Sequence, residues 1–328
     1  MDSFAFIVNP ATISQLKDYW PMVKIVPDFI IRSSLKNIPP FKAAHISKIR
    51  SSQGKEIEGY IVLCPLLPEL ILKLEQSLII DKLIAAAKIA EGLGVKIIGL
   101  NGDSCPLTEK AYKKSRIPFT NGNTLIAWSA FESIFRMAKV RKLNLKQSTV
   151  LIINATSAVG SLCAKKMAEY AGKIILSSEN KDKLKSLKEV IIEINPLQVD
   201  LAEDLEAAAQ GADVIINTTE GLDAPLVTRK FKPQAIVCDA SLHKNLSGPG
   251  IIKAGLIKLP FPTGLGFDTG LPKDVIPAAL AEVMLLTLKE KFTSYSLGDN
   301  INPDKLEEIA NLAAFHGFEV WVPEAPVL

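Results

Sequence analysis

The chain has 328 residues, of which 48% are hydrophobic and 22% are charged. This composition is typical of a globular protein and excludes the disordered, fibrous and collagen-like classes, while the length predicts two domains, or one large one, with a substantial core. The 38 basic and 35 acidic residues leave a formal net charge of +3, which is too balanced to indicate binding to nucleic acid.

The four cysteines are far apart in the sequence: Cys64, Cys105, Cys163 and Cys238. No C-x-x-C pair occurs, so neither a zinc knuckle nor a thioredoxin-type site is predicted, and no metal site is expected. Residues 1–20 lack the apolar core of a signal peptide, and the longest apolar run, residues 275–288, contains Glu282 and is too short to span a bilayer. We therefore expect a cytoplasmic protein with reduced thiols and no transmembrane segment.

The first 75 residues have no regular pattern apart from one apolar run that Pro65 ends. In chain order, the patterns then predict a strand over 61–64, a helix over 79–92, a strand over 96–100 and a helix over 123–140. From residue 149 strands and helices alternate regularly, with strands over 149–153, 173–176, 213–217 and 235–238, and helices over 160–171, 182–190, 274–288 and 304–316. That alternation is typical of a doubly wound α/β domain with a parallel sheet.

The segment after the strand over 149–153 lies where a dinucleotide-binding fold carries its phosphate-binding turn. Glycines in that turn let backbone amides approach a pyrophosphate at the positive end of the next helix. Only Gly160 is present, although Asn154 tolerates unusual backbone angles and Ser157 is small. The candidate cofactor-binding residues of the turn are Asn154, Ala155, Thr156, Ser157, Ala158, Val159 and Gly160. An ordinary strand–helix crossover is the alternative interpretation.

A carboxylate after the next strand indicates which dinucleotide would bind. Glu179, between Ser178 and Asn180, follows the start of the turn by roughly two dozen positions, where an acidic residue binds the adenosine ribose hydroxyls. It would repel the 2′-phosphate of NADP(H), so NAD(H) is the preferred cofactor; a solvated glutamate is the alternative. Thr218 and Thr219, after the strand over 213–217, complete the predicted cofactor-binding set.

The histidines and the remaining motifs add little. No P-loop, H-E-x-x-H, EF-hand loop or G-x-S-x-G elbow occurs. His45 is expected to be structural, and His316 is expected at a helix C-terminus, where a partly positive ring suits the helix dipole. His243 follows the strand over 235–238 and is a candidate ligand contact.

Segments spread over nearly the whole chain are similar to the motifs of one enzyme family. They are residues 59–69, 119–124, the phosphate turn, 239–246, 276–286, 294–300 and 315–318. Together they resemble the cyanobacterial long-chain acyl-(acyl carrier protein) reductases and their bacterial relatives, which are also described as predicted amino acid or shikimate-type dehydrogenases. The resemblance implies an enzyme that takes a fatty acyl group from acyl carrier protein onto a cysteine, reduces the thioester with NADPH and releases an aldehyde.

The resemblance also implies an organisation for the chain. An N-terminal α/β substrate domain would cover 1–121, a bridging helix 122–145 and a Rossmann dinucleotide-binding domain 146–270, with a C-terminal helical segment over 271–328 folding back across the cleft. The substrate cleft would include Cys64, Asn123, Thr124 and Asp239. Because ligands of open α/β sheets lie beyond the carboxyl ends of the strands, Cys105, Asn123, Thr218, Lys244 and Ala279 are expected to line one pocket.

Departures from the family pattern affect the chemistry directly. The family's acylated cysteine lies in a segment like I-P-A-C-x-A-E, and this chain has Ala279 at that position, which cannot be acylated. Asn154 and Ser157 replace expected glycines, Glu179 replaces the arginine that would pair with a 2′-phosphate, and Asp103-Ser104-Cys105 replaces a Phe-Thr-Ser-like loop. Several concerted departures favour a natural divergent paralogue over a single engineered substitution.

Three functions stay open at this point. The first is a diverged NAD(P)-dependent oxidoreductase without a covalent intermediate, whose polar groups near the cleft are Ser104, Asn123, Lys244 and Glu282. The second keeps acyl chemistry with the thiol relocated to Cys105 or Cys64. The third is a non-catalytic paralogue that binds a nucleotide or acyl ligand, or a subunit of a larger assembly. A small-molecule or acyl substrate is expected, and acyl carrier protein is a candidate partner.

Overall fold

A computed structural model describes residues 1–10, 12–71, 73–100, 110–111, 115–219, 231–241, 246, 248, 250–267, 269–298 and 301–322. The chain forms two compact units. The first unit comprises Met1–Gly122, Ile257–Gly298 and Asn311–Glu319, and the second comprises Asn123–Leu256, Asp299–Ala310 and Val320–Leu328. Across the described ranges, no helix combines the length and the apolar character needed to cross a membrane.

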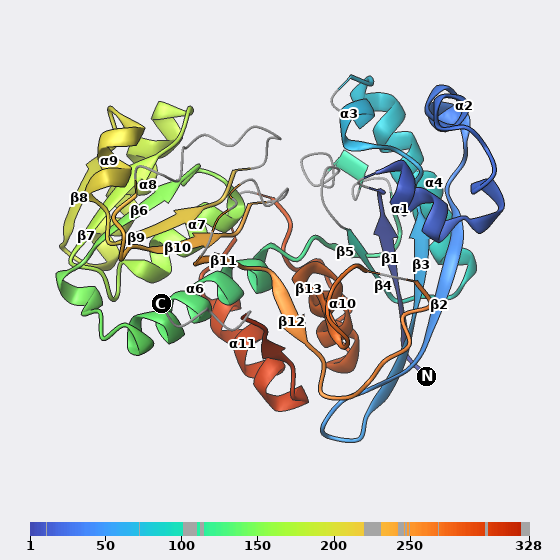
Figure 1. Ribbon diagram of the computed structural model, residues 1–328. Helices are drawn as coiled ribbons and strands as arrows, with labels where there is room; N and C mark the ends of the chain where they lie inside the picture. Colours follow the sequence, from blue (N-terminus) through green and yellow to red (C-terminus); the bar gives the residue numbers. More distant parts are fainter. Residues whose placement is uncertain are drawn as a thin grey trace. The chain divides into compact units, whose positions relative to one another are not determined.

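The first unit is built on a five-stranded sheet of order β2-β3-β1-β4-β5 (Figure 1). Its elements are β1 (Ser3–Val8), α1 (Ile13–Tyr19), α2 (Asp28–Ser34), β2 (Phe41–Arg50), β3 (Glu56–Leu63), α3 (Pro68–Ile71), α4 (Gln76–Gly92), β4 (Ile97–Leu100), β5 (Phe119–Thr120), β13 (Val275–Pro277) and α10 (Ala278–Leu288). β2 pairs antiparallel with β3, and the other neighbouring strands pair in parallel.

Two helices supply most of the core of this unit. α4 packs on the sheet through an apolar cluster that includes Ala5 and Ile7 of β1. α10 packs against β4, β1, β3 and β5, and all of its residues are buried. Its sequence is apolar on every side except for Glu282 and Thr287, which is the pattern of a fully buried helix.

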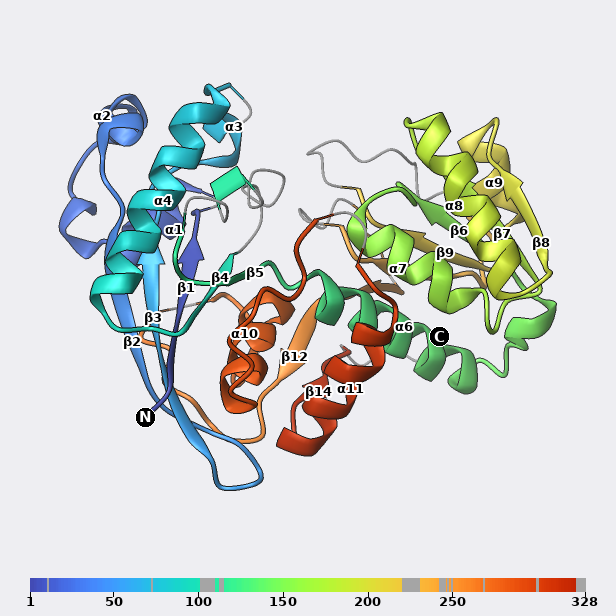
Figure 2. The same ribbon diagram turned by 180° about the vertical axis from the view of Figure 1, so that it is seen from behind.

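The second unit contains a six-stranded sheet of order β11-β10-β9-β6-β7-β8 (Figure 2). Its elements are α6 (Asn123–Val140), β6 (Thr149–Ile153), α7 (Ala158–Met167), β7 (Lys173–Ser177), α8 (Lys181–Ile194), β8 (Gln198–Leu201), α9 (Leu205–Gly211), β9 (Val214–Asn217), β10 (Ile236–Asp239) and β11 (Ile251–Lys253). Every neighbouring pair is parallel. Numbered along the chain from β6, the spatial order is 3-2-1-4-5-6, the order of the Rossmann fold.

Both faces of this sheet are covered. Val150 and Ile152 of β6 belong to a core cluster with α6, α7 and α8, whereas Leu151 and Ile153 belong to a second cluster with α9. This alternation along one strand confirms the predicted doubly wound α/β fold. A third, three-stranded sheet has the order β13-β12-β14, with β12 at Leu256–Lys258 and β14 at Glu319–Val320, and α11 (Asp304–His316) precedes β14.

Most of the predicted elements from residue 76 onward are confirmed, and two boundaries differ for local reasons. The helix predicted over 160–171 is α7, which begins at Ala158 because the Ser157 side chain accepts a hydrogen bond from the Gly160 amide. The helix predicted over 274–288 begins only at Ala278, because Val275–Pro277 pair as β13.

The N-terminal region is more regular than the sequence predicts. Residues 3–8 form β1, which lies in the interior of the five-stranded sheet between β3 and β4. A short continuous apolar run such as this one does not distinguish a strand from a buried helical segment. Its pairing partners, residues 58–63 and 97–100, also lie far along the chain.

His316, at the end of α11, is buried and its Nδ1 atom has no hydrogen-bond partner among the described residues. Burial, together with the nearby charges of Lys55 and Lys289, lowers the pKa of His316 below its ordinary value. The ring lies at a helix C-terminus as expected, but its burial favours the neutral form of the imidazole over the positively charged one.

We expect this histidine to make the protein less stable in acid. The unfolded chain takes up a proton near the ordinary value of 6.5, whereas the folded chain resists protonation, so the free energy of unfolding falls as the pH drops below about 6.5. The variant His316→Leu should lose this fall between about pH 6.5 and pH 5, measured by urea unfolding, with about pH 8 as the reference at which both proteins are neutral at this position. An unchanged slope in the variant would contradict the assignment.

Candidate functional site

The turn between β6 and α7 has the backbone form of a phosphate-binding turn without its first glycine. Asn154 has a φ of 56°, in the left-handed region that a short polar side chain tolerates best after glycine. Its Nδ2 donates to the Thr218 carbonyl at 3.2 Å, and its own carbonyl accepts from the Ser157 amide at 3.0 Å. The asparagine thus replaces a glycine and ties the turn to the end of β9.

Gly160 is required by the close packing of α7. A Cβ atom at this position would lie 2.6 Å from the Asn154 carbonyl oxygen and 2.7 Å from the Thr218 Oγ1 atom. Close helix–strand packing is the role of the last glycine in the dinucleotide fingerprint. The glycine that the sequence retains is therefore the one that α7 needs in order to approach the sheet.

Ser157 stands where the fingerprint has a glycine that lets the backbone approach a pyrophosphate. Its hydroxyl accepts from the Gly160 amide at 3.0 Å and lies 3.1 Å from Thr218 Oγ1, which in turn donates to the Ile153 carbonyl at 2.8 Å. The serine caps the third amide of α7. The amides of Ala158 and Val159 come before it in the helix, where no preceding turn supplies acceptors.

The predicted cofactor-binding residues come together at one edge of the sheet. Residues 154–160 follow β6, residues 178–180 follow β7, and Thr218 and Thr219 follow β9, which lies on the other side of β6. The Thr156 and Ser178 hydroxyls are in contact across the gap between β6 and β7. Glu179 is exposed at the end of β7, and Asn180 caps α8 by accepting from the Lys183 amide.

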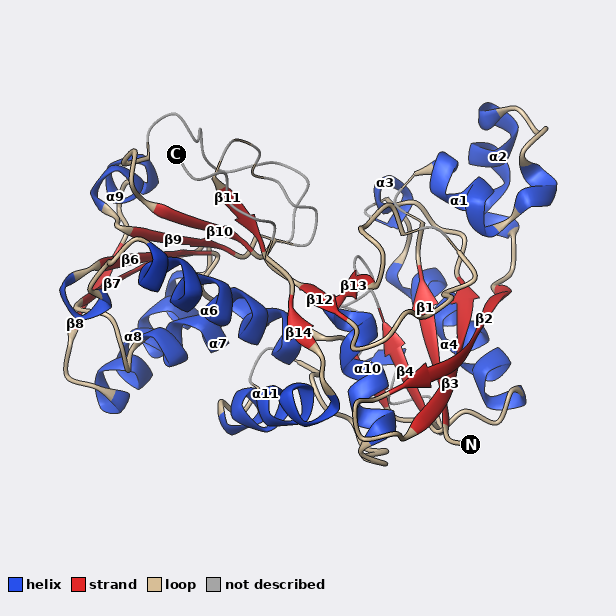
Figure 3. Ribbon diagram, turned by 60° about the horizontal axis from the view of Figure 1, so that its bottom comes forward, coloured by secondary structure: helices blue, strands red, loops and turns tan. Residues whose placement is uncertain are grey.

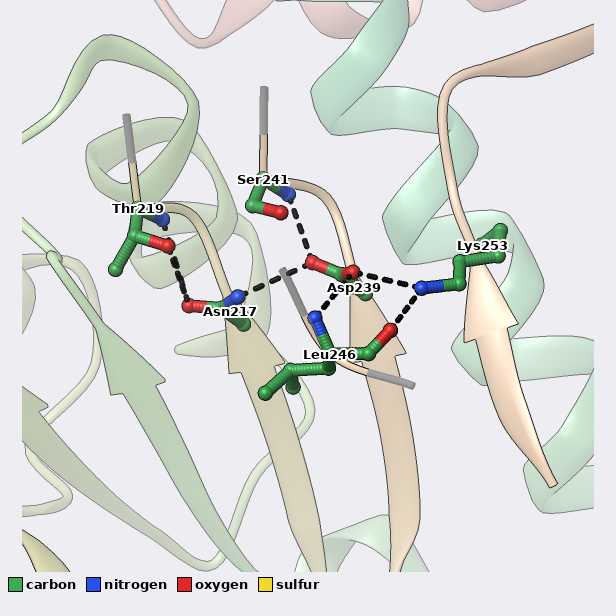
Figure 4. A network of polar contacts seen from close by, with 6 residues as sticks. All are labelled: Asn217, Thr219, Asp239, Ser241, Leu246 and Lys253. Carbon is green, nitrogen blue, oxygen red and sulfur yellow. Dashed lines mark hydrogen bonds and ion pairs between the residues drawn. The ribbon is translucent and has the colours of Figure 1, made fainter. Parts of the chain in front are cut away.

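Asp239, predicted for the substrate cleft, is at the centre of a buried polar network (Figure 4). Its Oδ1 accepts from Asn217 Nδ2 at 3.1 Å and from the Ser241 amide at 3.2 Å. Its Oδ2 accepts from the Leu246 amide and from Lys253 Nζ, both at 3.1 Å. A fully buried carboxylate needs such partners to offset its loss of water, and these connect the ends of β9, β10 and β11.

Sequence reasoning missed two members of this network. Asn217 connects Asp239 to Thr219, whose amide and hydroxyl donate to the Asn217 Oδ1 atom at 3.4 and 3.2 Å. Lys253 ends the short apolar strand β11, where a basic residue is unusual. The available signal was a lysine at the carboxyl end of a strand parallel to the one that ends in Asp239, because a buried carboxylate there requires a partner of opposite charge.

A second cluster lies within the first unit, at the N-terminus of α10. Ala279, the second residue of that helix, is 4% exposed. Gly122 has a φ of 83°, and a Cβ atom there would lie 2.3 Å from Ala279 Cα. One turn into α10, the fully buried Glu282 accepts from the Thr120 hydroxyl and from the Gly122 amide, the latter at 3.2 Å. These two contacts hold residues 120–122 over the start of α10.

Two of the described cysteines, Cys64 and Cys163, are not activated nucleophiles. Cys64 is buried in the apolar cluster beneath α4, and this burial raises the pKa of its thiol to about 12 in spite of the opposing effect of Lys82. Burial alone raises the pKa of Cys163 to about 12 as well. Because the thiolate is the reactive form, these values argue against a nucleophile relocated to Cys64.

The remaining candidate site residues either lie outside the described residues or begin α6. Cys105, Ser104, Lys244 and His243 lie outside the described residues. Asn123 and Thr124 begin α6, where Thr124 is fully buried and Asn123 is half-buried. No cluster of His, Cys, Asp and Glu suited to a metal ion occurs in the part of the chain that the structure describes.

One cavity of about 320 Å³ lies on the second unit, between the end of α6, residues 142–146 and Tyr170. These residues precede β6 or follow α7, so the cavity is at the amino edge of the strands, opposite the phosphate turn. Ligands of open α/β sheets bind at the carboxyl edge. The cavity is therefore not the candidate cofactor site.

No family model matches the chain, and the comparison with curated proteins gives relatives of low identity. The long-chain acyl-[acyl-carrier-protein] reductase of Synechococcus elongatus is 25% identical over 297 residues, which cover 83% of this chain and 85% of that protein. The aminotransferase PigE of a Serratia species is 23% identical in an alignment of 357 positions, gaps included, that covers 97% of this chain. The chain spans only 39% of the length of PigE.

This chain is a distant relative of an oxidoreductase. Among solved structures, L-tryptophan dehydrogenase from Nostoc punctiforme is similar with a TM-score of 0.38 and 13% identity, over 75% of this chain and 65% of that one. An ornithine carbamoyltransferase from Campylobacter jejuni has a TM-score of 0.36 and 10% identity, over 73% of this chain and 74% of that one.

The contact between Gly122 and Ala279 predicts a large cost for a single added methyl group. Gly122→Ala combines a left-handed backbone with a clash against the α10 backbone, so the free energy of unfolding should fall by about 2–5 kcal/mol. Gly54→Ala is the matched control, because Gly54 has a similar φ of 78° but no heavy atom within 4 Å of the added carbon, and it should cost about 1 kcal/mol. Equal losses of stability in urea unfolding would mean that residue 122 does not press on α10.

Proposed function

We propose that the protein is a nicotinamide-dependent oxidoreductase related to acyl-carrier-protein reductases, with chemistry altered by the loss of the family's cysteine. The observation that carries this proposal is the turn after β6, where Asn154 adopts the left-handed backbone and Gly160 allows no side chain. The turn lies beside Thr218 of β9, at the point where the strand order reverses. Dinucleotides bind at this point in sheets of this order.

The residues present suit the adenosine and phosphate half of such a cofactor. The amides at the start of α7 lie at the positive end of its helix dipole, where a pyrophosphate is stabilised. The exposed carboxylate of Glu179 is available to accept hydrogen bonds from ribose hydroxyls. When bound, the nicotinamide supplies or accepts a hydride, and the chain's own residues hold it and orient the substrate.

The lost nucleophile favours hydride transfer to a carbonyl or imine that is not attached to the enzyme. Ala279 presents only a methyl group at the N-terminus of α10, and the described cysteines with raised pKa values stay protonated near neutral pH. Such a transfer needs an oriented substrate and a proton donor but no thioester. A small acyl-derived or other carbonyl substrate is the class we propose, and acyl carrier protein is a candidate donor of it.

A non-catalytic nucleotide- or acyl-binding paralogue, alone or as a subunit of a larger assembly, is the second candidate, and a specific observation favours it. The Gly160 amide donates its hydrogen bond to the Ser157 hydroxyl and so is already paired. In the fingerprint, a glycine at the position of Ser157 lets the backbone approach the pyrophosphate. The loss of both the nucleophile and this glycine is what we expect in a chain that no longer catalyses a reaction.

Cofactor titration tests the proposal and its preference together. We expect NADH to bind about 5- to 150-fold more tightly than NADPH, because a carboxylate opposite a 2′-phosphate costs about 1–3 kcal/mol. Glu179→Arg should reverse the preference, and the control Glu179→Gln, which removes only the repulsion, should bind the two about equally. The measurement is nucleotide fluorescence on titration with protein. Tighter binding of NADPH by the wild type would overturn the preference, and binding of neither would favour the non-catalytic candidate.

Acylation tests the role of position 279. Incubated with a long-chain acyl thioester of acyl carrier protein, the wild type should form no covalent adduct. Ala279→Cys should form one, because a thiol at a helix N-terminus is stabilised as thiolate, attacks the acyl carbon and displaces the carrier's thiol. The matched control is Ala278→Cys, one residue earlier in the same helix. Intact-protein mass spectrometry reports the added acyl mass, and an adduct on the wild type would restore the relocated-thiol hypothesis.

A further inference from the structure

Residues 12–39, between β1 and β2, form an arm that is anchored to the first unit by one of its faces. The arm contains α1, α2 and two short 3₁₀ turns, and it stands beyond the ends of the strands of its sheet (Figure 3). Leu16, Ile31 and Leu35 are buried. The Tyr19 ring packs on Phe267 and the Trp20 ring on Phe41, each pair with centroids 5.1 Å apart. The arm therefore has its own fixed inner face.

The arm also exposes large apolar side chains. Met22 is 82% exposed, Ile25 is 92% exposed and Phe29 is 72% exposed. Met22 lies in the 3₁₀ turn Pro21–Val23, Ile25 lies in the turn that follows, and Phe29 lies in the first turn of α2 together with Ile30, which is 43% exposed, so the four side chains fall within one short stretch of the arm. Soluble proteins seldom gather side chains of this size at such exposure, and a gathered set marks an interaction surface. We call Met22, Ile25, Phe29 and Ile30 the apolar tip.

The charges around the apolar tip are predominantly positive. The arm carries four basic residues against two acidic ones. Asp28 is paired with Lys17 at 2.8 Å, so these two charges offset each other and the count that remains is three basic residues against one acidic residue. Lys24 lies between Met22 and Ile25 in the sequence, and Lys24 and Lys36 are both exposed.

We propose that the apolar tip docks on the surface of a lipid bilayer that contains anionic lipids. Side chains exposed by 72–92% stand out individually, so a rigid protein partner would need a matching hole for each, whereas a headgroup layer admits them separately. Basic residues beside protruding apolar ones are the combination that binds at anionic membrane surfaces. In the docked state Met22, Ile25 and Phe29 lie among the headgroups, and Lys24 and Lys36 face lipid phosphates.

Vesicle co-sedimentation of the full chain tests this proposal. We expect binding to vesicles with about one third phosphatidylglycerol, and weaker binding to pure phosphatidylcholine. The triple variant Met22→Ser, Ile25→Ser, Phe29→Ser should lower the partition coefficient by at least about tenfold, because it removes the inserted apolar surface. Lys24→Gln with Lys36→Gln should lower binding to the anionic vesicles only, and salt should reproduce that loss.

The matched control is Val140→Ser with Ile192→Ser, which removes exposed apolar side chains from the second unit and should leave binding unchanged. No binding by the wild type, or equal binding by the triple variant, would overturn the proposal. Concentration-dependent dimerisation that the triple variant abolishes would also overturn it, in favour of a second copy of the chain as the occupant. The assay uses neither cofactor nor turnover, so its failure would leave the proposed oxidoreductase function standing.

Discussion

The contact between the first turn of α7 and the ends of β6 and β9 is the constraint on which the second unit depends. At this point a helix approaches two parallel strands so closely that Gly160 has no room for a Cβ atom. The Thr218 hydroxyl is part of the same contact, because it bonds the Ile153 carbonyl and lies within reach of Ser157. The approach directs the N-terminus of α7 toward the edge where a dinucleotide phosphate would lie.

In each unit, one fully buried carboxyl group accepts hydrogen bonds from the segment that follows a strand. Asp239 holds the segment that follows β10 through the amides of Ser241 and Leu246. Glu282 holds the segment that follows β5 through the Thr120 hydroxyl and the Gly122 amide. In both cases the buried acid fixes a segment at the end of a strand, since a buried carboxyl group is stable only with such donors.

The N-terminus of α10 has a helix dipole and a closely packed loop but no group that can react. The Gly122 backbone presses on Ala279 so closely that the two positions constrain each other. A side chain larger than alanine at position 279 would have to point away from this loop.

The sequence by itself determined the α/β class, the positions of β6, α6 and α11 and the turn between β6 and α7, because each depends on apolar period or turn chemistry within a few residues. It did not determine β1, whose partners in β3 and β4 are distant in the chain. The burial of Cys64, the neutral state of His316 and the Asp239–Lys253 pair were likewise decided only by the tertiary structure. Each depends on which distant residues remove water from a polar group, and no local pattern encodes that.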